Sequence, residues 1–182
     1  WDYHDRGLGK NLARWFQAND VETPFLHLPF FEQKGRGDVR WISALSDNER
    51  DRERAIDEIK RALEFTDLQP VAHVVAHLGS PNQRFSPLQF EHAYSLMRHI
   101  SEFAGVDTLI ENIGNEISTV ERLREFLTLA QLPDIRICYD TGHGLLQGPL
   151  PRLDGVAAIH LIDNNGGSDD HLWPFEWELN WP

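Results

Sequence analysis

The sequence predicts an α/β domain in which parallel strands alternate with helices. Short apolar segments of strand type recur along the chain, separated by longer segments whose apolar residues have helical spacing. One of them, Val-Ala-His-Val-Val-Ala-His-Leu at 71–78, is almost continuously apolar, which is typical of a strand buried on both faces of a parallel sheet. The 182 residues are 41% hydrophobic and 25% charged, which fits one soluble domain over residues 1–182 with a sizeable core.

The first third of the chain contains two expected helices and one expected strand. Apolar residues recur at helical spacing within 1–19, so the chain opens on a helix. A short apolar segment at 25–28 is interpreted as a strand, and the glycine-containing segment 32–44 as a loop. A long amphipathic helix then begins at Ser46, which stands at capping-box spacing from Glu49.

The middle third repeats the alternation twice. The strand at 71–78 ends in a Gly-Ser-Pro turn and is followed by a helix over 86–103, with proline in the favoured first position. A strand at 108–111 precedes a helix over 118–130. Both helices begin at capping-box pairs, Ser86 with Gln89 and Ser118 with Glu121.

The last third is expected to hold two strands and little helix. Alternating apolar residues in Ile-Arg-Ile-Cys-Tyr-Asp predict a strand that ends in Asp140, with a sharp Thr-Gly turn before His143. The segment 144–154 is too short and too rich in proline and glycine to predict a full helix. A strand at 157–162 carries His160, and 163–182 is expected to form a loop.

Composition excludes some classes of function. The formal net charge of −12 disfavours nucleic acid as a partner, although bound divalent cations would offset that charge locally. The single cysteine, Cys138, rules out a disulfide framework and favours a reducing, cytoplasmic compartment. No apolar run is long enough for a membrane span, and no amino-terminal stretch resembles a signal peptide. Lysine is scarce, which disfavours a mechanism that needs a Schiff base on a lysine side chain.

Potential metal ligands stand at the carboxyl ends of the expected strands. Such ends converge on one face of a parallel α/β barrel, and imidazole with carboxylate suits zinc, manganese or iron-type ions. Taken alone, Asp140 followed by His143 could equally be a loop-capping residue beside a surface histidine. Because a residue of ligand type recurs at every expected strand end, we interpret these residues as metal ligands. His73 is assigned a structural role, and His4, His92 and His99 surface or packing roles. The strand-end set is His27, His77, Glu111, Asp140, His143 and His160, followed by Asp169 and His171 in the loop beyond.

Five sequence blocks resemble the xylose isomerase-like TIM barrel superfamily, which holds sugar isomerases and epimerases together with AP endonuclease family 2 proteins of the endonuclease IV type. They occur in the family's order over most of the chain. The blocks are Val-Val-Ala-His-Leu-Gly at 74–79, Ile-Glu-Asn at 110–112, Tyr-Asp-Thr-Gly-His at 139–143, Ile-His-Leu-Ile-Asp-Asn at 159–164 and Asp-Asp-His-Leu-Trp-Pro at 169–174. The resemblance implies a (β/α)8 barrel, incomplete here because the first and last strands are missing.

The resemblance also implies a ligand set. Glu111, Asp140 and His160 would bind one catalytic divalent metal, with zinc, manganese or cobalt as the candidates. In the isomerase and epimerase branch, the residue matching Glu111 also moves a proton at the carbon next to a carbonyl, while His77 and His143 would bind substrate oxygens or a second metal. In the endonuclease IV branch, three zinc ions would use the whole strand-end set, with His27 and Asp169 matched more loosely than the rest.

The sequence departs from the family pattern at its C-terminal end. The glutamate that the last barrel strand contributes as a further ligand, and as a second acid/base in epimerases, is absent. Beyond His171, aromatic residues replace the expected glycines in Pro-Phe-Glu-Trp at 174–177, so this loop needs another shape. An incomplete barrel also exposes two sheet edges, which predicts either that the chain is a fragment or that a partner, such as a second copy, covers them.

The expected function is that of a divalent-metal-dependent sugar or sugar-phosphate isomerase or epimerase. Proton transfer by Glu111 would take place beside a metal-polarised carbonyl. Phosphodiester hydrolysis at a multi-zinc site is the alternative, supported by the full histidine set and opposed by the net charge. A non-catalytic binding module on a degenerate barrel is a third hypothesis, supported by the missing glutamate and the aromatic loop.

Overall fold

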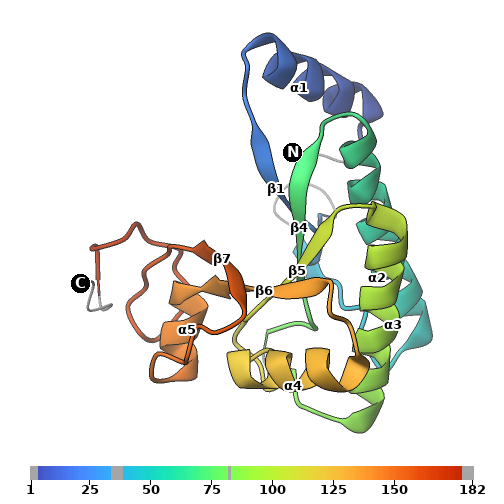
Figure 1. Cartoon of the computed structure of the whole chain (residues 1–182). Helices are drawn as coiled ribbons and strands as arrows, with labels where there is room; N and C mark the ends of the chain where they lie inside the picture. The colour runs from blue at the N-terminus through green and yellow to red at the C-terminus, as the bar shows by residue number, and fades with distance from the viewer. Residues whose placement is uncertain (1–3, 34–38, 82, 178–182) are drawn as a thin grey trace.

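A computed structural model describes residues 4–33, 39–81 and 83–177, and its centre is a five-stranded parallel sheet (Figure 1). The strands follow one another across the sheet in chain order, and every neighbouring pair is parallel. This confirms the expected alternation of strand and helix. The strands are β1 (Thr23–His27), β4 (Val71–His77), β5 (Asp107–Glu111), β6 (Ile135–Asp140) and β7 (Val156–His160).

The main helices α2, α3 and α4 pack against one face of this sheet (Figure 1). Strand residues such as Val74, Ile110 and Ile137 face these helices and are almost completely buried among their apolar side chains. No described helix has both the length and the apolar character needed to cross a membrane. The helices are α1 (Arg6–Ala18), α2 (Glu49–Leu63), the 3-10 turn η1 (Glu64–Asp67), α3 (Pro87–Ala104), α4 (Val120–Ala130) and α5 (Thr141–Gln147).

The opposite face of the sheet corresponds to the inside of a barrel. Because side chains alternate along a strand, Val75, Leu109 and Cys138 form a second small buried cluster on this face. Two residues further on, these strands end in the ionisable residues His77, Glu111 and Asp140, which face the same side of the sheet. The described residues contain five parallel strands, whereas a closed barrel of this type has eight. The fold is therefore an incomplete TIM-type barrel.

A short hairpin replaces the loop expected at 32–44. Strand β2 (Phe31–Gln33) pairs with β3 (Val39–Trp41) in antiparallel register, with Phe31 opposite Trp41. Aromatic packing explains the difference, since the Phe30 ring contacts those of both Phe31 and Trp41. A contact such as that between Phe30 and Trp41, eleven residues apart, leaves no periodic signal in a short segment. The tip at 34–38 lies outside the described residues.

A seven-residue helix, α5, occupies the place of the expected turn and non-helical segment after Asp140. The Asp140 side chain caps it by accepting a hydrogen bond from the backbone N–H of His143 at 2.7 Å. Its glycines do not break the helix here, because they make room for close packing. A Cβ added to Gly144 would lie less than 3.0 Å from three atoms of the buried Tyr139 ring.

Two helix caps also differ from expectation. Helix α2 is capped by Asn48, which accepts from the Asp51 N–H, and helix α4 by Thr119, which accepts from the Arg122 N–H. The serines expected at these places have other partners: Ser46 Oγ accepts from the Asn48 N–H, and Ser118 Oγ donates to the Leu78 carbonyl. Adjacent capping residues compete, and tertiary partners decide between them. For α3, Ser86 is the N-cap as expected.

We predict that Gly144→Ala destabilises the fold by about 1–3 kcal/mol, because the new methyl group forces the Tyr139 ring or helix α5 to move. Urea unfolding followed by circular dichroism measures this change. Gly114→Ala is the matched control, because a Cβ there meets nothing within 4 Å. Equal stability of the two variants would contradict the close packing of α5 on β6.

Candidate metal centre

Glu111, the last residue of β5, lies at the centre of a histidine cluster and is only 2% exposed. Its Oε2 is 3.1 Å from His27 Nε2 and 3.4 Å from His77 Nε2. Its Oε1 is 3.2 Å from His160 Nδ1 and 3.4 Å from His143 Nδ1. Each carboxylate oxygen therefore faces two imidazoles, which come from β1, β4, β7 and α5.

Asp140 contributes a second buried carboxylate. Its Oδ1 caps helix α5, whereas its Oδ2 is buried without a hydrogen-bond partner and lies 3.9 Å from His160 Nδ1. His77 Nε2 is also buried without a hydrogen-bond partner. Buried polar atoms without partners are costly, and both of these belong to atom types that bind divalent metals. The donor set therefore fits a divalent cation.

A third group of potential ligands, His143, Asp169 and His171, shares His143 with the cluster around Glu111 and Asp140. Asp169 Oδ2 lies 3.2 Å from His143 Nε2 and 3.3 Å from His171 Nε2. His171 has a φ of +52°, a backbone conformation that is uncommon outside glycine and is found at functional sites. An antiparallel bridge between Asp163 and Leu172 fixes this loop beside the end of β7.

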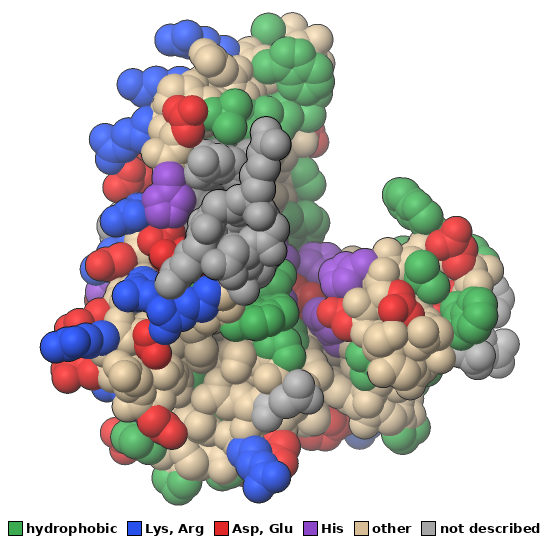
Figure 2. Space-filling model, turned by 180° about the vertical axis from the view of Figure 1, so that it is seen from behind, with side chains coloured by type: hydrophobic (Ala, Val, Ile, Leu, Met, Phe, Trp, Pro, Cys, Tyr) green, Lys and Arg blue, Asp and Glu red, His purple; other side chains and the backbone are tan. Residues whose placement is uncertain are grey.

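The structure brings together all eight residues expected at the site. Figure 2 shows the histidines in a cleft between the helix-bearing part of the chain and its C-terminal part. The excluded histidines lie elsewhere: His73 is 3.7 Å from Asp107, and His4 forms an ion pair with Glu58. Four groups have ligand atoms within 4.8 Å of one another: His27 with His77 and Glu111; Glu111 with Asp140 and His143; Glu111 with Cys138 and His160; and His143 with Asp169 and His171.

Two residues near the site were missed from the sequence. Cys138 joins Glu111 and His160 in one of these groups, and its place two residues before Asp140 on one strand face could have shown it. Asn112 acts as a support, because its side chain accepts from the Asp140 N–H at 2.7 Å and donates to the Asp140 carbonyl at 3.0 Å. No local pattern marks a contact between residues 28 positions apart.

Backbone carbonyls fix which ring nitrogen each of two histidines can offer. His27 Nδ1 lies 2.9 Å from the Leu28 carbonyl, and His143 Nδ1 lies 2.7 Å from the Asn112 carbonyl. A carbonyl only accepts, so both Nδ1 atoms carry the proton and both Nε2 atoms are left as ligands. His143 therefore belongs to the group with Asp169 and His171, which its Nε2 faces, more than to the group with Asp140.

The histidines differ sharply in pKa. Burial lowers the pKa of His77 to about 4, so this ring is neutral at pH 7. Burial also opposes the charging of His143, but hydrogen bonds to Asp169 and Glu111 outweigh it and raise the pKa to about 10. Cys138 and Glu111 raise the pKa of His160 to about 10 as well.

The carboxylates respond to the same environment. Burial alone would raise the pKa of Glu111, but hydrogen bonds from the surrounding imidazoles, with His143 the largest, hold it well below its usual range. Burial raises the pKa of Asp140, and the nearby His143 only partly opposes this. Without a metal, protons on His143 and His160 thus balance the buried carboxylate charge.

We predict that the affinity for zinc increases with pH between 6 and 8. His143 and His160 have a pKa near 10, whereas the ordinary value is 6.5. In the metal-free protein, their protons therefore stabilise the fold fully below pH 6.5, and this stabilisation is lost as the pH rises toward 10. Zinc must displace these protons, which changes its dissociation constant by up to about tenfold per pH unit for each proton. Competition titration with a chromogenic chelator measures it, and a pH-independent constant would contradict the assignment.

Comparison with known proteins places the fold in a known family. The model of the family described as xylose isomerase-like TIM barrel matches residues 1–182. An uncharacterized protein of Sinorhizobium fredii, y4fM, is 26% identical over 158 residues, which is 75% of this chain and 49% of that protein. The chain thus spans about half the length of this curated relative.

Several solved structures share the fold, among them two that cover nearly all of this chain. A D-tagatose 3-epimerase-like protein superimposes with a TM-score of 0.73 and 23% identity, over 97% of this chain and 69% of that one. The TTHB071 protein of Thermus thermophilus, soaked with ZnCl2, has a TM-score of 0.69 and 21% identity, over 96% and 69% of the two chains. From the match along its whole length, the chain belongs to the xylose isomerase-like TIM barrel family.

Proposed function

We propose that this chain carries the metal site of a sugar isomerase or epimerase. The observation that supports this most strongly is the buried Glu111 carboxylate, which is held ionised near the buried Asp140 Oδ2, an atom that makes no hydrogen bond. Glu111, Asp140 and His160 would hold a divalent cation, which would supply Lewis acidity toward a substrate carbonyl. Zinc, manganese and cobalt all suit these donors.

The residues around the cation have distinct roles in this proposal. Glu111, ionised at neutral pH, takes the proton from the carbon next to the carbonyl and returns it to the former carbonyl carbon, while the hydroxyl proton of the first carbon passes to the former carbonyl oxygen. His77, neutral at pH 7, orients a substrate hydroxyl. Cys138 and the apolar inner face below the site limit the access of water from that side.

A sugar suits the charge around the site better than a strongly anionic substrate does. Within the described residues, all ion pairs of Glu111, Asp140 and Asp169 are with histidines, and none is with Lys or Arg. A phosphate group would therefore find no Lys or Arg among these ion pairs, and only the cation and protonated histidines could neutralise it. The partner we propose is a small sugar, in a cytoplasmic setting.

We predict that Glu111→Gln abolishes proton exchange at the substrate carbon. The manganese-loaded chain would be incubated with a panel of ketoses and aldoses in D2O, and deuterium at the carbon next to the carbonyl would be followed by NMR. Loss of a general base reduces such a rate by about 10²–10⁴-fold. His73→Gln is the matched control, because His73 lies on the same inner face, at the N-terminal side of β4, away from the cluster.

Exchange with neither ketoses nor aldoses, by a chain that retains its metal, would refute the isomerase proposal and favour the non-catalytic binding module. Metal content therefore has to be measured on the same samples. Glu111→Gln is expected to weaken metal binding too, so its exchange rate is read at saturating manganese.

Multi-zinc phosphodiester hydrolysis remains a second candidate, and one observation favours it. His143, Asp169 and His171 form a third ligand group that a single-metal isomerase does not require. Adjacent metal ions can stabilise both the attacking and the leaving oxygen of a phosphodiester. The net charge of −12 counts against a nucleic acid substrate.

We predict that His171→Ala lowers the zinc content of a fully loaded chain by one ion if the third group binds metal. Elemental analysis after gel filtration gives the number of ions per chain. His99→Ala, on helix α3, is the control for a histidine outside the cluster. One metal per chain in both wild type and His171→Ala would eliminate the three-zinc hypothesis; three ions with cleavage of abasic DNA would establish it in place of the isomerase.

A further inference from the structure

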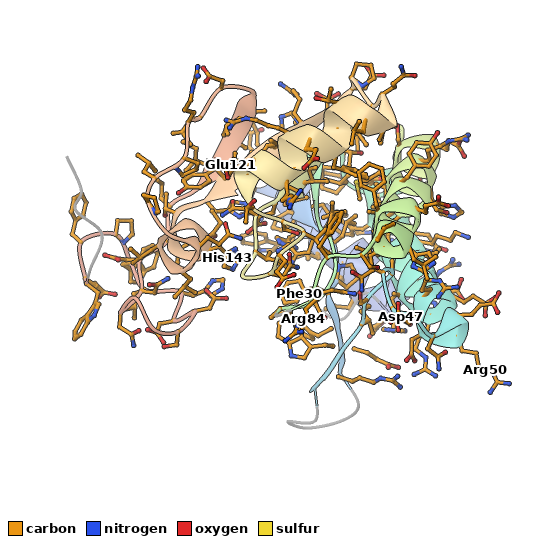
Figure 3. All side chains as sticks on the ribbon, turned by 90° about the horizontal axis from the view of Figure 1, so that it is seen from below. Phe30, Asp47, Arg50, Arg84, Glu121 and His143 are labelled. Carbon is orange, nitrogen blue, oxygen red and sulfur yellow. The ribbon has the colours of Figure 1, made fainter. Side chains whose placement is uncertain are left out.

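A pocket of about 470 Å³ lies beside the hairpin strand β3 and the start of helix α2, and the metal centre does not use it. Its volume is in the range of small-molecule sites. Figure 3 shows Phe30 between His143 of the metal centre and Asp47 of the pocket wall. The lining includes Arg40, Trp41, Ser43, Asp47, Ser80 and Gln83.

A row of stacked aromatic rings connects this pocket to the metal centre. The rings of His77 and Phe30 are stacked with centroids 4.7 Å apart, and those of Phe30 and Trp41 are stacked at 5.3 Å. A small cavity of about 20 Å³ is lined by His77, Phe30 and Ser43, the last of which also lines the pocket. His77 lies beside Glu111, and two ring contacts, His77 with Phe30 and Phe30 with Trp41, lead from there to the pocket. One ligand could therefore reach both Glu111 and Trp41.

Part of the pocket wall is a network of hydrogen-bonded polar groups. Gln83 Oε1 accepts hydrogen bonds from Ser43 Oγ at 3.2 Å and from the Ser80 N–H at 3.1 Å, and its Nε2 donates to the Leu45 carbonyl at 3.3 Å. The pocket thus has its shape before any ligand arrives, which lowers the entropic cost of binding. Trp41 itself is 51% exposed, so a face of a large apolar ring is open to solvent.

The charges lining the pocket cancel. Arg40 forms a 2.5 Å ion pair with Asp51, and Arg54 lies 3.8 Å from Glu32. Among the lining residues themselves, Asp47 and Asp51 match Arg40 and Arg54 in number. No uncompensated cation is therefore offered to a phosphate by the described residues of the lining. A neutral polyol matches this lining, because its hydroxyls both donate and accept hydrogen bonds and the C–H face of a pyranose packs on an aromatic ring.

We propose that this pocket is a second sugar subsite, which binds a neutral pyranose unit joined to the sugar held at the metal centre. Trp41 stacks on the apolar face of that unit, and polar side chains around it bind the hydroxyls. The inference rests on the proposed function, and it narrows the substrate class from sugars and sugar phosphates to neutral glycosides or disaccharides.

The test compares ligands of one and two sugar units on the 182-residue chain. Disaccharides of gluco, galacto and manno configuration, the matching monosaccharides and glucose 6-phosphate are titrated calorimetrically, with and without manganese. We expect at least one disaccharide to bind about tenfold more tightly than its monosaccharide, and Trp41→Ala to remove that advantage while monosaccharide affinity stays unchanged. Trp15→Ala, an equally exposed tryptophan on α1, should keep the advantage.

Three results would overturn the subsite: no disaccharide preference with any configuration, a preference that survives Trp41→Ala, or tighter binding of glucose 6-phosphate than of every neutral sugar. Trp41→Phe, which keeps a stacking ring, should retain most of the preference and guards against misfolding of the alanine variant. Trp41-dependent binding without proton exchange would leave the subsite standing and reject the isomerase. Proton exchange on monosaccharides without any preference for disaccharides would support the isomerase and reject the subsite.

Discussion

The buried carboxylate of Glu111 depends on the imidazoles around it, and separate parts of the fold supply them. An ionised carboxylate withdrawn from water is strongly destabilising unless partners replace its hydration. Four imidazoles at 3.1–3.4 Å provide this, two at each oxygen. Because these histidines come from β1, β4, β7 and α5, the register of the sheet and the position of α5 are both tied to one buried charge.

The same constraint links protonation, metal binding and stability. Without metal, His143 and His160 keep their protons well above their ordinary pKa, whereas His77 Nε2 and Asp140 Oδ2 make no hydrogen bond. A divalent cation among these atoms would take over the charge balance and satisfy the two that make no hydrogen bond. The stacked rings of His77, Phe30 and Trp41 then continue from this charged centre into a pocket whose own charges cancel. Charge is thus concentrated at the metal site, and the adjoining surface suits a neutral ligand.

The errors made from the sequence share one physical origin. Helix α5 was missed because glycine is a helix breaker in isolation, whereas Gly144 here admits the Tyr139 ring. The β2–β3 hairpin was missed because the Phe30 ring packs on the rings of both Phe31 and Trp41, and no local period marks that packing. In both places contacts between elements outweighed local propensity, which is the usual limit of reasoning from one segment at a time.

The sequence by itself determined the order of the five sheet strands and of the four longest helices, and it pointed to the candidate ligand residues. It did so because a parallel strand needs a run of apolar side chains, and because His, Asp or Glu directly after such a run stands out. Only the tertiary structure decided how those residues group. The alternation of the strands places His77, Glu111 and His160 on one face, while backbone carbonyls orient the rings of His27 and His143. Distances between side chains depend on the register and twist of the sheet, which no single segment encodes.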